Sequence, residues 1–356
     1  MMETDRLKVR HSPPKECNEN HKNGVQKIKY SFLRILTGSD LSKRRLPLME
    51  AKSSNPGPVV WLTACSHGDE IGGIVIIHEI FKIIRKNPLL SGTLFAFPLM
   101  NPIGLETASR NITLSMEDLN RSFPGNKQGS VAERMANLIF ATIEETNPTL
   151  VLDLHNDWSK SIPYTLLDPP PDAKHTDTYE KAKSFSGKTG FLVISEQRDA
   201  GGTYDSIKTL TGSLIERDIP ALTLEMGESF VVNEKNVEYG VKSIWNVLSL
   251  LGMTNPEDEL FRYQLPENIS GKILVYSQQP VSSTSGIIRF NVKPGEIVKK
   301  GKPVAKIYNA FGKLQETIDA VHDGILLGYS DSSVAFPGIP LMAFGIIDTN
   351  YNQTSS

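Results

Sequence analysis

The sequence predicts an α/β protein whose mixed sheet is flanked by helices, followed by an all-β, barrel-like domain. Two observations support this fold class. Up to about residue 257, short apolar runs alternate with amphipathic helical segments, as is typical of α/β domains. From Lys272 onward, short β-prone runs are separated by Gly and Pro without a helical period. We therefore expect a disordered arm over residues 1–24, an α/β domain over 25–257 and a β domain over 258–356.

The composition is that of an ordinary globular protein. The chain of 356 residues has 38 basic and 40 acidic residues, and its net charge of -2 gives no reason to expect nucleic acid or a membrane as a partner. Two cysteines are too few for a disulfide framework. The first residues do not resemble a secretory signal, and no apolar run is long enough for a membrane helix. These features predict a soluble cytoplasmic protein.

The α/β domain is expected to begin with a β-hairpin. Two β-prone runs, at 30–36 and 44–51, flank a polar turn that contains Gly38 and Asp40. The apolar run VVWLTA at 59–64 then predicts a strand buried on both faces. This strand leads through CSHGDE into a helix over about Ile71–Lys86, which the following Asn-Pro pair would end.

Strands and helices continue to alternate after this helix. A capping-box pattern of Ser130 and Glu133 precedes a predicted helix at 132–145. The remaining expected elements are a strand at 93–100, a long polar loop at 101–129, strands at 149–155, 191–195 and 220–226, and a helix over about Val237–Leu250.

Polar side chains stand at the ends of several predicted strands. His67, Asn101, His155 and Glu225 each come at or just after such an end. Ligand sites in open α/β sheets lie beyond the C-terminal ends of the strands. We therefore expect these four side chains to share one site.

Three residues, His67, Glu70 and His155, form a candidate metal centre. His67 and Glu70 are three residues apart where a strand turns into a helix, so both side chains can face one ion. Two imidazoles and one carboxylate with an open fourth position are typical of catalytic zinc, which lowers the pKa of its bound water to ~7. A lone His-x-x-Glu pair is also common in proteins without metal, so these residues alone leave both interpretations open.

Five motifs together resemble a known family. HGDE, NPIGLETASR, DLNRSFPG, DLHND and TLEMGE follow in the order and approximate spacing of the succinylglutamate desuccinylase/aspartoacylase family, a branch of the zinc carboxypeptidase-like hydrolases. The resemblance covers roughly residues 30–250. It implies a zinc-carboxypeptidase-like mixed sheet, one zinc ion per chain and hydrolysis of the amide bond of a small-molecule N-acyl amino acid.

The resemblance also implies roles for the residues around the metal. His67, Glu70 and His155 match the zinc ligands. Glu225 matches the general base that activates the zinc-bound water and later protonates the leaving amine.

Substrate-binding residues are implied in the same way. Arg110 matches the arginine that polarises the scissile carbonyl, and Asn120 and Arg121 match the pair that holds the substrate carboxylate. The gap between Arg110 and Asn120 is a few residues longer than in aspartoacylase, which affects the expected loop conformation more than the role. Tyr204, in a glycine-flanked loop, is either a substrate contact or an ordinary loop residue.

The C-terminal region resembles a different fold. The turn PGEIVKKGKP and the strand entry HDGIL resemble the hammerhead β-barrel of biotinyl and lipoyl domains. A carrier domain would present a modified lysine between methionines or acidic residues, whereas Lys313 lies in NAFGKLQET. We therefore expect no attached prosthetic group, and the sequence leaves the role of this domain open.

Two other functions remain as alternatives to the deacylase. One is a metallocarboxypeptidase that acts on short peptides, and the other is a catalytically inactive zinc-containing homologue that only binds a ligand. A serine hydrolase is not supported, because the sequence has no Gly-x-Ser-x-Gly motif. The sequence does not determine the acyl group, the pathway or whether the chain forms a homo-oligomer.

Overall fold

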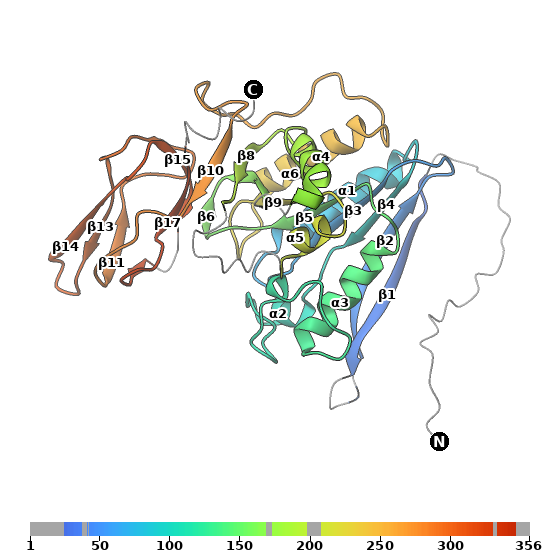
Figure 1. Ribbon diagram of the computed structural model, residues 1–356, viewed down its shortest axis with the longest axis horizontal. Coiled ribbons are helices and arrows are strands. Elements are labelled where there is room, and N and C mark those ends of the chain that lie inside the picture. Colours follow the sequence, from blue (N-terminus) through green and yellow to red (C-terminus); the bar gives the residue numbers. More distant parts are fainter. Residues whose placement is uncertain are drawn as a thin grey trace.

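The computed structural model describes residues 25–37, 41, 43–168, 173–197, 208–329 and 333–346 (Figure 1). The predicted arm and Tyr204 lie outside these residues. The helices are α1 (Gly72–Lys86), α2 (Pro102–Glu106), η1 (Leu119–Arg121), α3 (Val131–Glu144), η2 (Ala173–His175), α4 (Thr176–Ser186), α5 (Leu210–Ile215) and α6 (Glu234–Leu250). None of the described helices is both long and apolar enough to cross a membrane.

The strands divide between two parts of the chain, which we call the first half (up to α6) and the C-terminal part (from β10 onward). The first half holds β1 (Ile28–Thr37), β2 (Lys43–Lys52), β3 (Val59–Ala64), β4 (Thr93–Phe97), β5 (Leu150–His155), β6 (Lys160–Ser161), β7 (Pro163–Leu167), β8 (Leu192–Ser195) and β9 (Ala221–Met226). The C-terminal part holds β10 (Ile273–Ser277), β11 (Gly286–Phe290), β12 (Ile297–Val298), β13 (Pro303–Tyr308), β14 (Leu314–Asp319), β15 (Gly324–Tyr329), β16 (Val334–Ala335) and β17 (Met342–Ile346).

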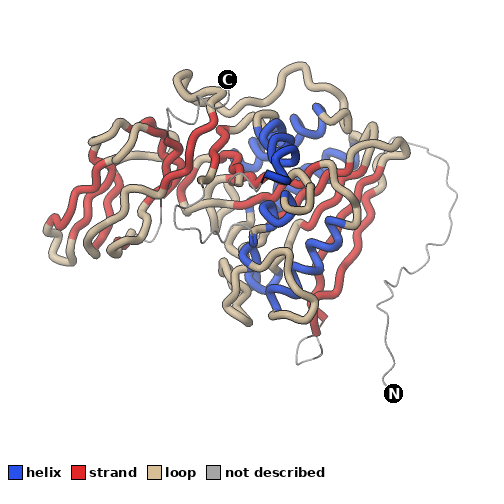
Figure 2. Tube along the Cα trace, in the orientation of Figure 1, coloured by secondary structure: helices blue, strands red, loops and turns tan. Residues whose placement is uncertain are grey.

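A mixed sheet passes through both halves of the described chain (Figure 2). Its strand order is β1-β2-β4-β3-β5-β9-β7-β8-β10-β17-β15-β12, and β6 pairs with β15. The pairs β3–β4, β3–β5 and β5–β9 are parallel, whereas β1–β2, β2–β4 and β7–β9 are antiparallel. The predicted mixed sheet is therefore confirmed.

Helices cover both faces of the sheet's first half (Figure 1). Along β3, Val60 and Leu62 point to a cluster that also contains buried residues of α1 and α6. The intervening Trp61 points to the opposite cluster, which contains buried residues of α3 and α5. Because strand side chains alternate between faces, the continuous apolar run of β3 fits a strand buried on both sides, as predicted.

Most predicted elements are found close to their expected positions. The N-terminal hairpin is the antiparallel pair β1–β2, and α3 begins with the predicted capping box of Ser130 and Glu133. α6 begins at Glu234, earlier than predicted, because the Asn233 side chain accepts from the backbone amides of Lys235 and Asn236.

The predicted long polar loop at 101–129 is not free of secondary structure. It contains α2, which begins where the Asn101 side chain accepts from the backbone amide of Gly104 and Pro102 occupies the first turn. A proline at this position lacks an amide that the helix would leave unpaired in any case. The same segment also contains η1, whose N-cap is Asp118.

The C-terminal part is rich in β-strands, as predicted, but it is joined to the first half by backbone hydrogen bonds. β10 pairs in parallel with β8, so the main sheet continues into β17, β15 and β12. A second sheet with the order β14-β13-β11-β16 shares an apolar cluster with β12, β15 and β17 of the main sheet. The boundary that we predicted near residue 257 is therefore crossed by one continuous sheet.

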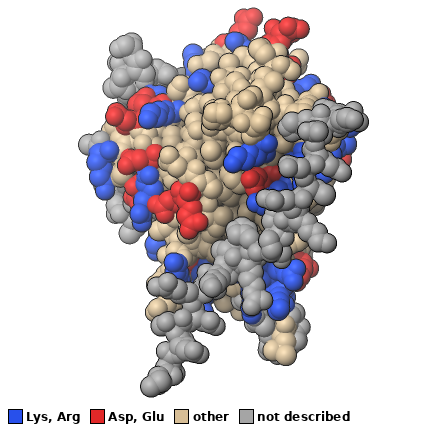
Figure 3. All heavy atoms as spheres, turned by 90° about the vertical axis from the view of Figure 1, so that its right-hand side faces the viewer, with Lys and Arg blue, Asp and Glu red and all other residues tan. Residues whose placement is uncertain are grey.

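Charged side chains are mixed on the face shown in Figure 3. Lys and Arg lie between Asp and Glu, without a broad area of one sign on the visible described surface. This distribution agrees with the near-balance of 38 basic and 40 acidic residues in the sequence.

Candidate active site

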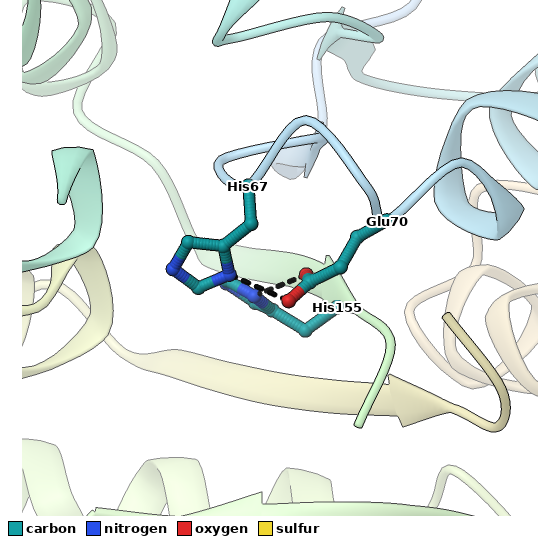
Figure 4. Close-up of side chains that lie close together, drawn as sticks. All are labelled: His67, Glu70 and His155. Carbon is teal, nitrogen blue, oxygen red and sulfur yellow. Dashed lines mark hydrogen bonds and ion pairs between the residues drawn. The ribbon is translucent and has the colours of Figure 1, made fainter. Parts of the chain in front are cut away.

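The structure brings His67, Glu70 and His155 together (Figure 4). One ligand atom from each lies within 4.8 Å of the others, and all three residues are buried. His155 is the last residue of β5, whereas His67 and Glu70 belong to the turn between β3 and α1. β3 and β5 are parallel neighbours, so both chain segments leave the sheet at the same edge, as the sequence predicted.

Gly68 allows this turn to approach α2. A Cβ atom added at Gly68 would lie 1.9 Å from the backbone carbon of Gly104, which no side chain could tolerate. The amide of Gly68 also donates to the carbonyl of Ser109 at 2.9 Å. A residue without a side chain is thus required between the two proposed ligands of the HGDE motif.

A carboxylate holds the outer nitrogen of each imidazole. Nε2 of His67 lies 3.1 Å from Asp118 Oδ1, and Nε2 of His155 lies 2.9 Å from Asp153 Oδ2. Asp153 is itself held by Thr63, whose hydroxyl donates to Oδ1 at 2.6 Å. Metal-binding histidines commonly donate their second ring N–H to a carboxylate in this way, which fixes the tautomer and the ring orientation.

The donor atoms fit a divalent cation. With a proton on each Nε2, both Nδ1 atoms carry a lone pair, yet they face Glu70 oxygens at 2.5 Å for His67 and 2.8 Å for His155. Facing acceptors require either an additional proton or a cation between them. Burial would lower the pKa of His155, but Asp153 and Glu70 raise it well above its usual value. Two imidazoles and one carboxylate form a donor set that suits zinc.

Glu225 lies directly beside this cluster. It is the parallel register partner of His155 and the antiparallel partner of Tyr164. Its side chain is buried, and Oε2 has no hydrogen-bond partner among the described residues. Burial raises the pKa of Glu225 well above its usual value, and the nearby Asp157 carboxylate raises it further. The buried environment therefore favours the protonated form of this carboxyl group more than water does.

Arg110 reaches the candidate metal cluster from the segment between α2 and η1. Its Nε and Nη2 donate to Asp118 Oδ2 at 3.1 and 2.9 Å, and its Nη1 lies 3.4 Å from His67 Nδ1. About half of the side chain remains exposed. The guanidinium therefore has one side fixed by Asp118 and a second side that faces the cluster and solvent.

Asn120 and Arg121 follow Asp118 in η1 and differ in exposure. Asn120 is buried, with Nδ2 3.4 Å from His155 Nε2, and its Oδ1 accepts from the amide of Leu210. Arg121 is exposed, and its Nη1 donates to the backbone carbonyl of Asn120 at 2.8 Å. The structure thus places Asn120 at the cluster and Arg121 at its rim.

Several carboxylates and phenols of the site were not among the predicted residues. Asp118 and Asp153 lie inside the motifs DLNRSFPG and DLHND, and Asp153 precedes His155 by two residues on β5, so their positions within these motifs were a signal that could have identified them. Asp157 accepts from the hydroxyl of Tyr164 at 2.5 Å. Burial raises the pKa of Tyr276, on β10, and the Asp157 charge raises it further. Asp157 is the last residue of DLHND, so the same signal applied to it, whereas no sequence pattern indicated Tyr164 or Tyr276.

Comparisons with known proteins agree with the resemblance seen in the motifs. The sequence profile of the succinylglutamate desuccinylase/aspartoacylase catalytic domain matches residues 56–251. A curated relative is the N-alpha-acetyl-L-2,4-diaminobutyric acid deacetylase of Halomonas elongata. It is 25% identical over 314 residues, which are 84% of this chain and 86% of that protein.

Solved structures share the fold over nearly the whole chain. The product-bound ectoine utilization protein EutE (DoeB) from Ruegeria pomeroyi superposes with a TM-score of 0.75 at 20% identity, covering 90% of this chain and 95% of that one. A succinylglutamate desuccinylase/aspartoacylase from Rhodobacter sphaeroides gives a TM-score of 0.74 at 19% identity, covering 92% and 98%. Because these matches include the C-terminal part, the whole two-part architecture is shared.

Proposed function

The chain belongs to the succinylglutamate desuccinylase/aspartoacylase family, and from this premise we propose that it is a zinc-dependent deacylase that hydrolyses the amide bond of an N-acyl amino acid. One observation carries the proposal: the buried carboxylate of Glu225 has an oxygen without a described hydrogen-bond partner and lies beside the proposed ligand His155. A proton acceptor next to a metal-binding cluster is the arrangement that hydrolysis by activated water requires.

His67, Glu70 and His155 would hold one zinc ion, which supplies a Lewis acid for water and for the scissile carbonyl. Glu225 accepts the proton that the attacking water loses, and it then delivers this proton to the amine nitrogen as the amide bond breaks. The raised pKa of Glu225 makes its carboxylate a stronger proton acceptor than an exposed glutamate.

Polar residues of the segment 101–129 would bind the substrate. Arg110 faces the cluster with Nη1, where it can stabilise negative charge that develops on the carbonyl oxygen. Asn120 and Arg121 would hold the substrate carboxylate, with the guanidinium able to bond both oxygens once it leaves the Asn120 carbonyl. Asp118 keeps Arg110 in place through two hydrogen bonds.

A substrate panel tests this function. The purified protein is supplied with zinc and offered acetyl-, succinyl- and formyl-amino acids, including N-α-acetyl-L-2,4-diaminobutyrate because of the similarity to the Halomonas elongata enzyme. We expect release of a free amino acid that stops when a chelator is added and resumes with zinc. Faster turnover of short peptides than of any N-acyl amino acid would instead favour a metallocarboxypeptidase.

The change Glu225→Gln separates an enzyme from a zinc-containing binding protein. Gln keeps the size of the side chain but cannot accept the proton, so kcat should fall by about 10²- to 10⁴-fold. Zinc content should stay near one ion per chain, because Glu225 is not a proposed ligand. Unchanged turnover in this variant would remove Glu225 from the mechanism.

A further inference from the structure

The loop that follows His155 is held by the C-terminal part of the chain. β6, within this loop, pairs with β15, so that Ser161 is the register partner of Gly328 and Lys160 that of Tyr329. The amide of Ile162 donates to the carbonyl of Leu327 at 2.9 Å. A segment a few residues from a proposed metal ligand thus pairs with a strand of the C-terminal part.

Gly328 allows β6 to lie this close. A Cβ atom at Gly328 would lie 2.7 Å from Ser161 Cβ, 2.9 Å from the carbonyl oxygen of Lys160 and 2.9 Å from Trp158 Cδ1. One of these contacts is backbone, so a side chain at this position would displace the loop. Trp158 also has a positive φ of 55°, a conformation that bulky residues adopt only when their surroundings impose it.

The same loop leads directly to the general base. The hydroxyl of Ser161 donates to the backbone carbonyl of Asp157, and the amide of Asp157 donates to the carbonyl of Gly227 at 3.1 Å. The Asp157 carboxylate then accepts from Tyr164, which lies beside Glu225 in the sheet. Gly328, Ser161, Asp157, Tyr164 and Glu225 therefore form one continuous series of contacts or strand pairings.

We propose that Gly328 and Ser161 are positioning residues, through which β15 holds Asp157 and Tyr164 in the geometry that places Glu225 for proton transfer. The C-terminal part would thereby set the rate of the chemical step without touching the substrate. This inference rests on the proposed function, because it assigns Glu225 the role of proton acceptor.

A pair of glycine substitutions on the same strand tests the inference. In Gly328→Ala the new methyl group meets β6, whereas in Gly324→Ala it would lie 2.6 Å from the Gly345 carbonyl oxygen of β17 and contact no residue of the loop that follows His155. A displacement of about 1 Å at a catalytic group can cost up to about 100-fold in rate. We expect Gly328→Ala to lower kcat by about 10- to 100-fold with little change in KM, and Gly324→Ala to leave kcat within about twofold of the wild type, since its methyl lies away from the loop.

The change Ser161→Ala provides a gentler probe, because it removes only the hydroxyl that donates to the Asp157 carbonyl. It should lower kcat in the wild-type background but cause little further loss when Tyr164 is already Phe, which cannot donate to Asp157, since both residues act through one series of contacts. Equal kcat losses in Gly328→Ala and Gly324→Ala would overturn the inference. It would also be overturned if the kcat loss from Ser161→Ala multiplied with the loss from the second substitution when both are combined.

Hydrogen exchange supplies a readout that does not depend on turnover. The amides of residues 157–162 should exchange faster in Gly328→Ala than in Gly324→Ala, while zinc content stays equal in both. Unchanged exchange in this segment would contradict the proposal that β15 keeps the loop in place. If the wild type hydrolyses no N-acyl amino acid, the proposed function fails, and the exchange result still decides whether β15 holds the loop.

Discussion

At the scale of single residues, the site consists of paired groups. Each imidazole has one nitrogen directed toward Glu70 and the other fixed by a carboxylate, and Glu225 stands beside His155. The proposed ligands are therefore oriented by partners that are not themselves proposed ligands. Such partners can be tested separately from the groups that they orient.

The carboxylates behind the imidazoles should control zinc affinity. Asp118→Asn or Asp153→Asn weakens the acceptor that orients a histidine, and we expect zinc binding to weaken by about 10- to 100-fold in either variant. Competition with a fluorescent chelator measures this change. Glu228→Gln is a suitable control, since Glu228 accepts hydrogen bonds from Asn233 and Asn236 rather than from a proposed ligand. Equal zinc affinity in all variants would contradict the prediction.

Asp157 should influence the pH dependence of turnover through its charge. The Asp157 carboxylate, whose own pKa is raised by burial to about 6, raises the pKa of Glu225. Glu225 must be deprotonated to accept a proton, so activity falls as the pH drops through its pKa. Asp157→Asn removes the repulsion and lowers that pKa. We therefore expect the acidic limb of kcat/KM against pH to move to lower pH, and a shift to higher pH would refute this account.

At the scale of elements, local signals and tertiary contacts agree at α3. Ser130 Oγ accepts from the amide of Glu133 at 3.2 Å, and Glu133 Oε2 accepts from the amide of Ser130 at 2.8 Å. The buried face of α3 contributes Met135, Ile139 and Phe140 to one of the two apolar clusters of the sheet. The cap therefore stabilises a helix that supports the sheet from one side.

Removal of this cap should cost a measurable part of the stability. In Ser130→Ala the amide of Glu133 loses its acceptor, and we expect the free energy of unfolding to fall by about 1 kcal/mol. Urea denaturation followed by circular dichroism measures the change. Ser184→Ala, at an exposed position within α4, is the control and should be neutral or slightly stabilising, because alanine favours helix interiors. Equal effects of both substitutions would show that the cap contributes nothing.

At the scale of the whole molecule, the proposed ion joins segments that are far apart in sequence. His67 and Glu70 precede α1, and His155 ends β5. An ion that binds only the folded chain stabilises it in proportion to the logarithm of its free concentration relative to Kd, by about 2.7 kcal/mol at one hundred times Kd. The Tm should therefore fall on chelation and rise again with added zinc.

Two controls sharpen this thermal experiment. His155→Ala removes one proposed ligand, so its Tm should respond little to zinc. Magnesium prefers oxygen ligands in octahedral geometry and should not replace zinc at a site with two imidazoles. A Tm rise of equal size with magnesium, or in the alanine variant, would place the stabilising ion elsewhere.

The sequence by itself determined the elements and residues that depend on local patterns. The apolar run of β3, the capping box of α3 and the positions of His67, His155 and Glu225 at strand ends could all be predicted, because apolar runs, caps and strand ends are recorded in neighbouring residues. The tertiary structure agrees with these predictions, since parallel strands bring their C-terminal ends to one edge of the sheet.

Only the tertiary structure decided which distant segments meet. The continuation of the sheet from β8 into β10, the bond from Tyr164 to Asp157 and the contact of Gly328 with Ser161 depend on strand register and on the absence of a single Cβ atom. Such contacts join residues that share no periodicity in the chain, so no local pattern can encode them. Strand pairing is a property of two segments, and the sequence displays each one alone, so the pairing of β8 with β10 could not be predicted from either strand.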